Sequence, residues 1–202
     1  MDIFKTELNE VENIEIVPKT KHLCWIYEND DDRLNVAGPY LLSALVKRKQ
    51  CLLVLPDEAV KKLLEEAVAA DVNVARYQET GQLITLTPEE MFLEKGALNA
   101  DLVIDRLQKA IDNAQAKGWA GISIVTDPSS VLERSGEEEW LALEFRADYE
   151  CSSRACTMLC LYDQRRISGS FLTSIIKVHP VIGLGNTLAR NPFYVIQPIS
   201  AS

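Results

Sequence analysis

Short apolar runs and helical periodicities alternate along the chain from about residue 21 onward. Runs that are apolar throughout are typical of strands buried on both faces of a sheet, and we expect such strands at residues 22–27, 51–55, 83–86, 121–126 and 156–162. Apolar residues that recur every three or four positions predict amphipathic helices at residues 36–45, 57–68, 99–117, 137–150 and 170–178. This alternation predicts an α/β fold of three layers, in which a mostly parallel central sheet carries helices on both faces.

Local signals refine this prediction at several places. Residues 28–32 are interpreted as an acidic turn after the first strand, and a further strand is an open alternative at Val72–Arg76. The tetrapeptide Thr87-Pro88-Glu89-Glu90 fits a capping box, in which Thr caps a helix, Pro takes its first position and Glu its third. Residues 181–197 predict one or two strands interrupted by glycine and proline.

The length of 202 residues suits one domain. We expect residues 1–20 to form an N-terminal arm and residues 21–202 to form a single domain, because no linker or repeat divides them. No apolar run approaches the length of a membrane span, and the first residues do not resemble a signal peptide. The odd count of five cysteines indicates reduced thiols, so we expect a cytoplasmic protein that makes no contact with a membrane.

The chain is acidic, with a formal net charge of −9 and a pI of about 4.8. Nucleic-acid binding draws much of its affinity from Lys and Arg side chains on phosphates, and no basic stripe is present. The short basic run Lys47-Arg48-Lys49 falls at the expected end of a helix, where cations complement the helix dipole. We therefore expect no nucleic acid among the partners of this domain.

The loop after the first strand bears on nucleotide binding. Ligands of parallel α/β sheets bind beyond the carboxyl ends of the strands, and a phosphate-binding loop there needs glycines and a lysine. Residues 27–33 contain no glycine and four carboxylates, which would repel a phosphate. The spacing does not match a calcium loop either, so we interpret these carboxylates as a solvated turn and expect no cofactor.

Asp127 directly follows the fourth main strand, in the segment Thr126-Asp127-Pro128-Ser129-Ser130. A carboxylate at this point of an α/β sheet often binds a ligand. It equally often caps the segment that follows, and the sequence leaves both interpretations open.

Cysteine and histidine supply the other candidate chemistry. Alternation along the strand places Cys160 and Tyr162 on one face and Asp163 on the other. Together with Cys24 and His179, Cys160 offers the atom types for zinc or for a thiolate activated by imidazole, but the spacing supports neither and we predict no metal site. We interpret each cysteine as a core residue and expect His22 to be solvated.

His179 stands before Pro180, at the expected end of a helix that proline does not allow to continue. It is one of only two histidines in the chain. A cap or a buried, hydrogen-bonded side chain is one interpretation, and a contact to a ligand is the other.

Several segments, none of them specific alone, together resemble the MEDS domain, the sensory domain of methanogen and methylotroph regulators that includes the regulator of dichloromethane degradation. The resemblance covers about residues 21–195 and rests on the order of these pieces: Cys24-Trp25-Ile26-Tyr27-Glu28, Pro39-Tyr40-Leu41, Gly81-Gln82-Leu83, Gly118-Trp119-Ala120-Gly121, Cys160-Leu161-Tyr162-Asp163, His179-Pro180-Val181 and Asn191-Pro192-Phe193-Tyr194.

The resemblance implies a RecA-like (KaiC-like) architecture without a Walker A loop, and a domain that senses small hydrocarbon derivatives and passes the signal to an output domain. It also implies that Cys160 and His179 contact the ligand. The chain departs from the family pattern at the end of the fourth strand, where a Gly-Glu pair, a preceding Arg and a following Trp correspond to Thr126-Asp127, Ser123 and Ser130. This departure predicts a different ligand or a degenerate site.

We therefore predict a non-catalytic domain that senses a small molecule in signal transduction or transcriptional regulation. The predicted pocket has Cys160 at its floor and is lined by Tyr27, Glu28, Asp127, Tyr162, Asp163 and His179. Its expected partners are the ligand and a signalling protein, and a homodimer is an open alternative. Two rival functions are an enzyme that uses Cys160 and His179, with or without a metal, and an acidic protein-interaction module.

Overall fold

A seven-stranded sheet forms the centre of the molecule in the computed structural model, which describes residues 21–185 and 187–195. The strand order is β3-β2-β6-β7-β1-β8-β9, and every neighbouring pair is parallel except β8 and β9. The strands are β1 (His22–Tyr27), β2 (Gln50–Val54), β3 (Leu83–Leu86), β6 (Ile122–Thr126), β7 (Cys156–Asp163), β8 (Val181–Leu184) and β9 (Thr187–Arg190). The predicted α/β fold with a mostly parallel central sheet is confirmed.

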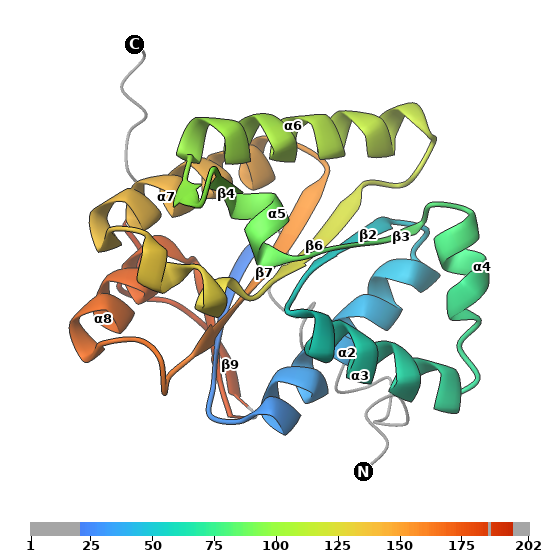
Figure 1. Cartoon of the computed structure of the whole chain (residues 1–202), viewed down its shortest axis with the longest axis horizontal. Helices are drawn as coiled ribbons and strands as arrows, with labels where there is room; N and C mark the ends of the chain where they lie inside the picture. The colour runs from blue at the N-terminus through green and yellow to red at the C-terminus, as the bar shows by residue number, and fades with distance from the viewer. Residues whose placement is uncertain (1–20, 186, 196–202) are drawn as a thin grey trace.

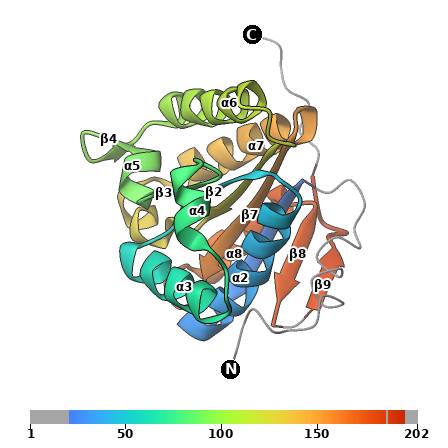
Figure 2. The same ribbon diagram turned by 90° about the vertical axis from the view of Figure 1, so that its right-hand side faces the viewer.

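Helices cover both faces of this sheet (Figure 1). On one face lie α5 (Pro88–Phe92), α6 (Ala100–Ala116), α7 (Glu137–Ser153) and α8 (Gly169–Val178). On the other face lie α2 (Asp30–Val46), α3 (Asp57–Ala69) and the short α4 (Val74–Glu79). Figure 2 shows the two layers from the side, with β8 and β9 at the margin of the sheet. A small hairpin of β4 (Leu93–Glu94) and β5 (Ala97–Leu98) precedes α6.

Two hydrophobic cores follow from strand alternation, because successive side chains point to opposite faces. Cys24 and Ile26 of β1 face the core beneath α6, α7 and α8, together with Met158 and Cys160 of β7. Leu23, Trp25 and Tyr27 face the core beneath α2 and α3, together with Leu159 and Leu161. The prediction that Cys160 and Tyr162 share a face is confirmed.

Most predicted elements lie within a few residues of the observed ones. The capping box is confirmed, since Thr87 Oγ1 accepts from the Glu90 amide and the Glu90 side chain accepts from the Thr87 amide. The strand considered at residues 72–76 is wrong, because Asn73 caps a helix there by accepting from the Arg76 amide. The acidic turn is also shorter than predicted, since α2 already begins at Asp30.

The predicted arm at residues 1–20 lies outside the described residues, and the division into an arm and one domain stays a prediction. Within the part of the chain that the structure describes, no helix is long and apolar enough to cross a bilayer.

Candidate functional site

Four side chains of metal-ligating type meet inside the core between the sheet and helices α7 and α8. They are His22 at the start of β1, Glu144 on α7, Cys160 on β7 and His179 at the carboxyl end of α8. One donor atom from each lies within 4.8 Å of all the others, and every one of the four residues is buried. We call these residues the buried cluster.

Three features of the fold bring the cluster together. Strands β1 and β7 are parallel with Cys24 opposite Cys160, so His22, two residues earlier, shares the face of Cys160. On α7, Glu144 lies on the same buried stripe as Trp140 and Leu143. The backbone leaves the helical conformation at His179, which ends α8 before the turn into β8.

Glu144 connects the members of the cluster. Its Oε1 accepts a hydrogen bond from Trp140 Nε1 at 3.1 Å and another from the hydroxyl of Tyr162. Its Oε2 lies 3.2 Å from His22 Nε2 and 3.5 Å from His179 Nε2. One carboxylate oxygen is therefore held by the protein framework, and the other faces both imidazoles.

Cys160 completes the contacts of His22. The Cys160 Sγ lies 3.3 Å from His22 Nε2 and 3.9 Å from Glu144 Oε2. The two imidazole rings lie face to face at a tilt, with centroids 4.2 Å apart. All four groups thus point toward one shared volume.

The far side of each imidazole also meets a polar group. His179 Nδ1 is 2.9 Å from the carbonyl oxygen of Ile175, and because a carbonyl only accepts, we assign the proton to Nδ1. His22 Nδ1 is 3.4 Å from Asp148 Oδ1, and the other oxygen of Asp148 accepts from the Tyr194 hydroxyl at 2.5 Å. These contacts leave the Nε2 atom of each ring directed at the cluster.

Some polar atoms of this region lack a hydrogen-bond partner although they are buried. They include His22 Nδ1, Asp148 Oδ1 and His179 Nε2. An unpaired polar atom in a protein interior costs about 1–3 kcal/mol, so each of them calls for an explanation.

The cluster shifts the acidity of its members. Burial alone lowers the pKa of His22, but the charge of Cys160 and the neighbouring carboxylates outweigh it and raise that pKa well above the usual value. Burial likewise lowers the pKa of His179, and contacts with Cys160 and Glu144 raise it overall.

The acids of the cluster shift in the opposite sense. Burial raises the pKa of Glu144, but the two imidazoles overcome this effect and hold it far below its usual range. Burial and Glu144 raise the pKa of Cys160, whereas the imidazoles lower it, and the net direction is downward. Charged forms are therefore favoured deep in the core.

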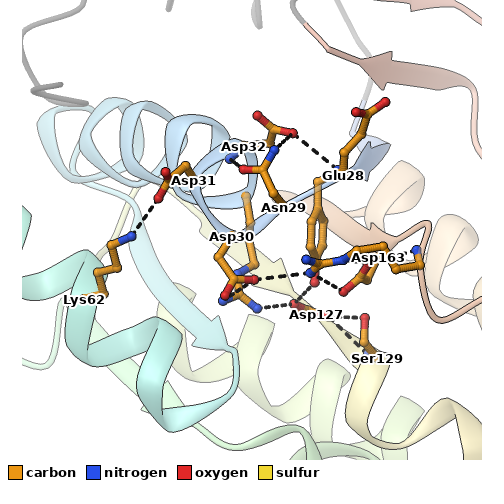
Figure 3. Close-up of polar contacts among 12 residues, drawn as sticks. Glu28, Asn29, Asp30, Asp31, Asp32, Lys62, Asp127, Ser129 and Asp163 are labelled. Carbon is orange, nitrogen blue, oxygen red and sulfur yellow. Dashed lines mark hydrogen bonds and ion pairs between the residues drawn. The ribbon is translucent and has the colours of Figure 1, made fainter.

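A second polar group, the strand-end network, lies where β1 and β6 end (Figure 3). Asp127 is fully buried and accepts from Tyr27 Oη at 2.8 Å and from Arg33 Nη1 at 3.0 Å through one oxygen. Its other oxygen accepts from the Ser129 amide at 3.1 Å and the Ser129 hydroxyl at 2.6 Å. Asp127 thus caps the short 3-10 helix Pro128–Ser130, one of the two interpretations that the sequence left open.

The acidic loop belongs to the same edge of the sheet. Asn29 caps α2 by accepting from the Asp32 amide at 3.0 Å, and Asp30, Asp31 and Asp32 occupy the first turn of that helix. Carboxylates at this position complement the helix dipole and occupy the place where a phosphate would otherwise bind. Glu28 is exposed beside them.

Asp163 ends β7 at this edge and accepts three hydrogen bonds from Arg165, from the amide at 2.9 Å, from Nε at 2.8 Å and from Nη2 at 2.7 Å. Arg165 also reaches Asp30 at 3.4 Å. Burial alone raises the pKa of Asp163, but Arg165 and its amide lower it overall.

The predicted site residues fall into two groups in the structure. Cys160 and His179 belong to the buried cluster and Tyr162 contacts its Glu144, whereas Tyr27 and Asp127 meet in the strand-end network. Glu28 and Asp163 belong to the edge of the sheet with the second group. All five cysteines are free and buried, as predicted, and Cys151 Sγ lies 3.2 Å from Cys156 Sγ.

The sequence analysis missed His22 and Glu144 of the buried cluster, and Asp148 beside it. The prediction of a solvated His22 is wrong, because its side chain is fully buried under α7. Glu144 and Asp148 were overlooked, although both interrupt the apolar stripe of the helix that Trp140 and Cys151 help to define. A carboxylate on the apolar stripe of a helix is a signal that could have identified them.

Comparison with known proteins adds an independent observation. The family model described as "MEDS: MEthanogen/methylotroph, DcmR Sensory domain" matches residues 21–180. No curated protein matches the chain. The matched residues include β1, α7, β7 and α8, and hence all four members of the buried cluster. Since the match covers most of the chain, this protein belongs to the MEDS family of sensory domains.

Proposed function

We propose that this sensory domain detects a small molecule through the buried cluster and not through the loops at the strand ends. The observation that carries the proposal is the set of unpaired polar atoms there, above all His179 Nε2, which faces Glu144 Oε2 at 3.5 Å without a hydrogen bond. In the strand-end network the carboxylate of Asp127 is fully bonded, since its two oxygens accept four hydrogen bonds, and Arg33 Nε is left without a partner.

The ligand proposed is a small hydrocarbon derivative with a polar end, in keeping with the family. Its polar end contacts Cys160, His179 and Tyr162, and its apolar part is accepted by neighbours such as Phe171 and Ile175. A few directed polar groups in an apolar surrounding are typical of small-molecule sites. Tyr27, Glu28, Asp127 and Asp163 then have a supporting role, in which they fix the edge of the sheet.

The proposed route of the signal runs through the helices that hold the cluster. Glu144 belongs to α7 and His179 ends α8, so a molecule that bonds to both side chains links the two helices to β1 and β7. A ligand shifts a conformational equilibrium only by its difference in affinity for the two states. If α7 and α8 take different positions with and without this link, the ligand binds the two states with different affinities. A signalling partner that contacts α7 or α8 would then detect the change in helix position.

Thermal shift assays on the full chain test the proposal, with panels of short alcohols, amines, ketones and halogenated alkanes. A ligand at 100 times its Kd adds about 2.7 kcal/mol to the free energy of unfolding. We expect at least one compound to raise the Tm of the wild type, and the rise to disappear in Tyr162→Phe. The matched control Tyr27→Phe should keep the rise, because Tyr27 belongs to the strand-end network.

Two outcomes would count against the proposal. One is a complete panel without any shift in Tm. The other is a shift that Tyr27→Phe abolishes and Tyr162→Phe leaves intact, which would move the ligand to the strand ends.

An enzyme with a Cys160 nucleophile is the second candidate function. The observation in its favour is the distance of 3.3 Å between Cys160 Sγ and His22 Nε2, together with the lowered pKa of the thiol. Iodoacetamide labelling followed by peptide mass spectrometry separates the two functions. A sensor core predicts that native Cys160 reacts no faster than the buried Cys51, whereas a catalytic thiolate predicts selective labelling of Cys160.

A further inference from the structure

We infer that the buried cluster is a binding site for a divalent transition-metal ion of the Zn²⁺ class. The four donors are His22 Nε2, Glu144 Oε2, Cys160 Sγ and His179 Nε2. This inference goes beyond the proposed function, and an ion would compete with a small molecule for Cys160 Sγ and His179 Nε2.

The separations between the donor atoms lie near those that a tetrahedral ion requires. Bonds of about 2.0–2.3 Å from zinc to nitrogen, oxygen and sulfur place neighbouring donors about 3.3–3.8 Å apart. The recorded separations from Glu144 Oε2 are 3.2 Å to His22 Nε2, 3.5 Å to His179 Nε2 and 3.9 Å to Cys160 Sγ. His22 Nε2 lies 3.3 Å from Cys160 Sγ, and no donor is more than 4.8 Å from another. Small side-chain movements suffice to close the set around an ion.

The groups behind the donors have the arrangement found around metal ligands. A metal-bound histidine nearly always donates its other N–H to a carboxylate or a backbone carbonyl. His179 Nδ1 faces the carbonyl of Ile175 at 2.9 Å, and His22 Nδ1 lies 3.4 Å from Asp148 Oδ1, near this carboxylate without a hydrogen bond. Both rings therefore turn Nε2 toward the shared volume.

Glu144 is held in the same manner. Its Oε1 accepts from Trp140 and Tyr162, which fixes the plane of the carboxylate and leaves Oε2 for the ion. The hydroxyl of Tyr194 in turn holds Asp148, the residue behind His22.

The charges also balance around a divalent ion. One thiolate and one carboxylate cancel two positive charges, and the neutral imidazoles add none. Without an ion, His179 Nε2 lies 3.5 Å from Glu144 Oε2 and makes no hydrogen bond. A cation between the two atoms supplies the partner that His179 Nε2 lacks.

The donor set selects the class of metal. Thiolate and imidazole favour Zn²⁺ and related first-row ions, whereas Ca²⁺ and Mg²⁺ require mainly oxygen ligands. Four protein donors from four separate elements close the tetrahedron, as in structural zinc sites. Binding would release the Cys160 thiol proton, and any proton carried by the imidazole Nε2 atoms, to solvent.

Titration of the full metal-free chain with Co²⁺ tests the inference, because a tetrahedral Co²⁺–thiolate site absorbs strongly in the visible and near-ultraviolet regions. We expect one equivalent to saturate both bands, and an equimolar amount of Zn²⁺ to abolish them. Cys160→Ser should lose the thiolate charge-transfer band, and His179→Ala should weaken the Kd by more than about 100-fold. The matched control Cys156→Ser, on the same strand and the same face, should keep both bands.

Visible bands that are absent, or too weak for a tetrahedral Co²⁺ site, in the folded wild type would overturn the inference. So would bands that Cys160→Ser leaves intact, or that Cys156→Ser removes. If Cys160→Ser does not fold, the wild type still decides, since chelation by EDTA must then remove the Co²⁺ bands and lower the Tm. Screening the metal-free chain with small molecules tests sensing separately from metal binding. A compound that raises the Tm of the metal-free chain supports sensing even where no metal binds.

Discussion

The buried cluster and the strand-end network each bury a carboxylate against the same sheet, but the two carboxylates differ in their hydrogen bonds. Asp127 of the network is fully buried and has four donors around its two oxygens. Glu144 of the cluster has two donors on one oxygen. Its other oxygen lies 3.9 Å from the Cys160 thiol and faces two imidazoles, of which His179 Nε2 has no hydrogen-bond partner.

The difference teaches where a ligand can gain binding energy. A carboxylate whose oxygens already accept four hydrogen bonds gains little from a further donor, so the network is expected to stabilise the fold and not to bind a ligand. Polar atoms without partners gain a full hydrogen bond or a metal bond from a ligand. Conventional α/β reasoning favours the strand ends as the binding site. Buried polar atoms without a hydrogen-bond partner occur in both regions, since Arg33 Nε of the network lacks one as well. The interior beneath α7 and α8 is favoured because its unpaired atoms lie at a group of metal-ligating side chains.

The largest expected effect is that of Glu144→Ala. Removal of this carboxylate leaves His22 and His179 without their shared anion and Trp140 without an acceptor. We expect a loss of about 3–5 kcal/mol in the free energy of unfolding, measured with urea in the presence of a chelator. Glu144→Gln is the matched control, because its amide oxygen can still accept from Trp140, and it should lose less. Equal losses in both variants would show that the ion pairs contribute nothing.

The next largest effect is expected from Asp127→Ala in the network. The substitution leaves the Arg33 guanidinium, the Tyr27 hydroxyl and the Ser129 amide without their acceptor. We expect a loss of about 2–3 kcal/mol in the free energy of unfolding. Asp127→Asn should lose less, because the Asn side chain can still cap the 3-10 helix. Binding of Co²⁺ should not change in either variant. A weakened Kd for Co²⁺ would mean that the two regions are coupled.

A smaller, pH-dependent effect is expected at Asp163. Arg165 and its amide hold the pKa of this carboxyl below its usual value, so its contribution to stability is present above about pH 4 and is lost as pH falls through the lower folded pKa. Asp163→Asn should therefore cost about 1 kcal/mol at pH 7, and the difference from the wild type should shrink toward pH 3. Urea unfolding at both pH values measures it. A difference that grows on acidification would contradict the assignment.

The smallest effect is expected for Lys62→Ala, which removes the ion pair between Lys62 Nζ and Asp31 at 2.7 Å. Both side chains are largely exposed, so solvent and salt screen the pair. We expect no measurable change in the free energy of unfolding and no change in ligand or metal binding. A loss comparable to that of Asp127→Ala would mean that the loop at the start of α2 supports the sheet edge more strongly than its exposure suggests.

Much of the fold could be predicted from the sequence because its signals are local. Buried strands such as residues 51–54 are continuous apolar runs, and the capping box at Thr87 depends on residues three positions apart. The segment 72–76 was ambiguous for the same reason, since its apolar residues suit a strand and only the cap at Asn73 favours a helix.

The sequence by itself thus determined the class of fold, the absence of a glycine-rich phosphate loop after β1, and the candidacy of Cys160, Tyr162 and His179. Only the tertiary structure decided that His22 and Glu144 join Cys160 and His179, while Tyr27 and Asp127 belong to another group. The reason is that these contacts join residues 16 or more positions apart, and 138 apart for His22 and Cys160. Their meeting depends on the register between β1 and β7 and on how α7 and α8 pack over them, and no local pattern encodes either.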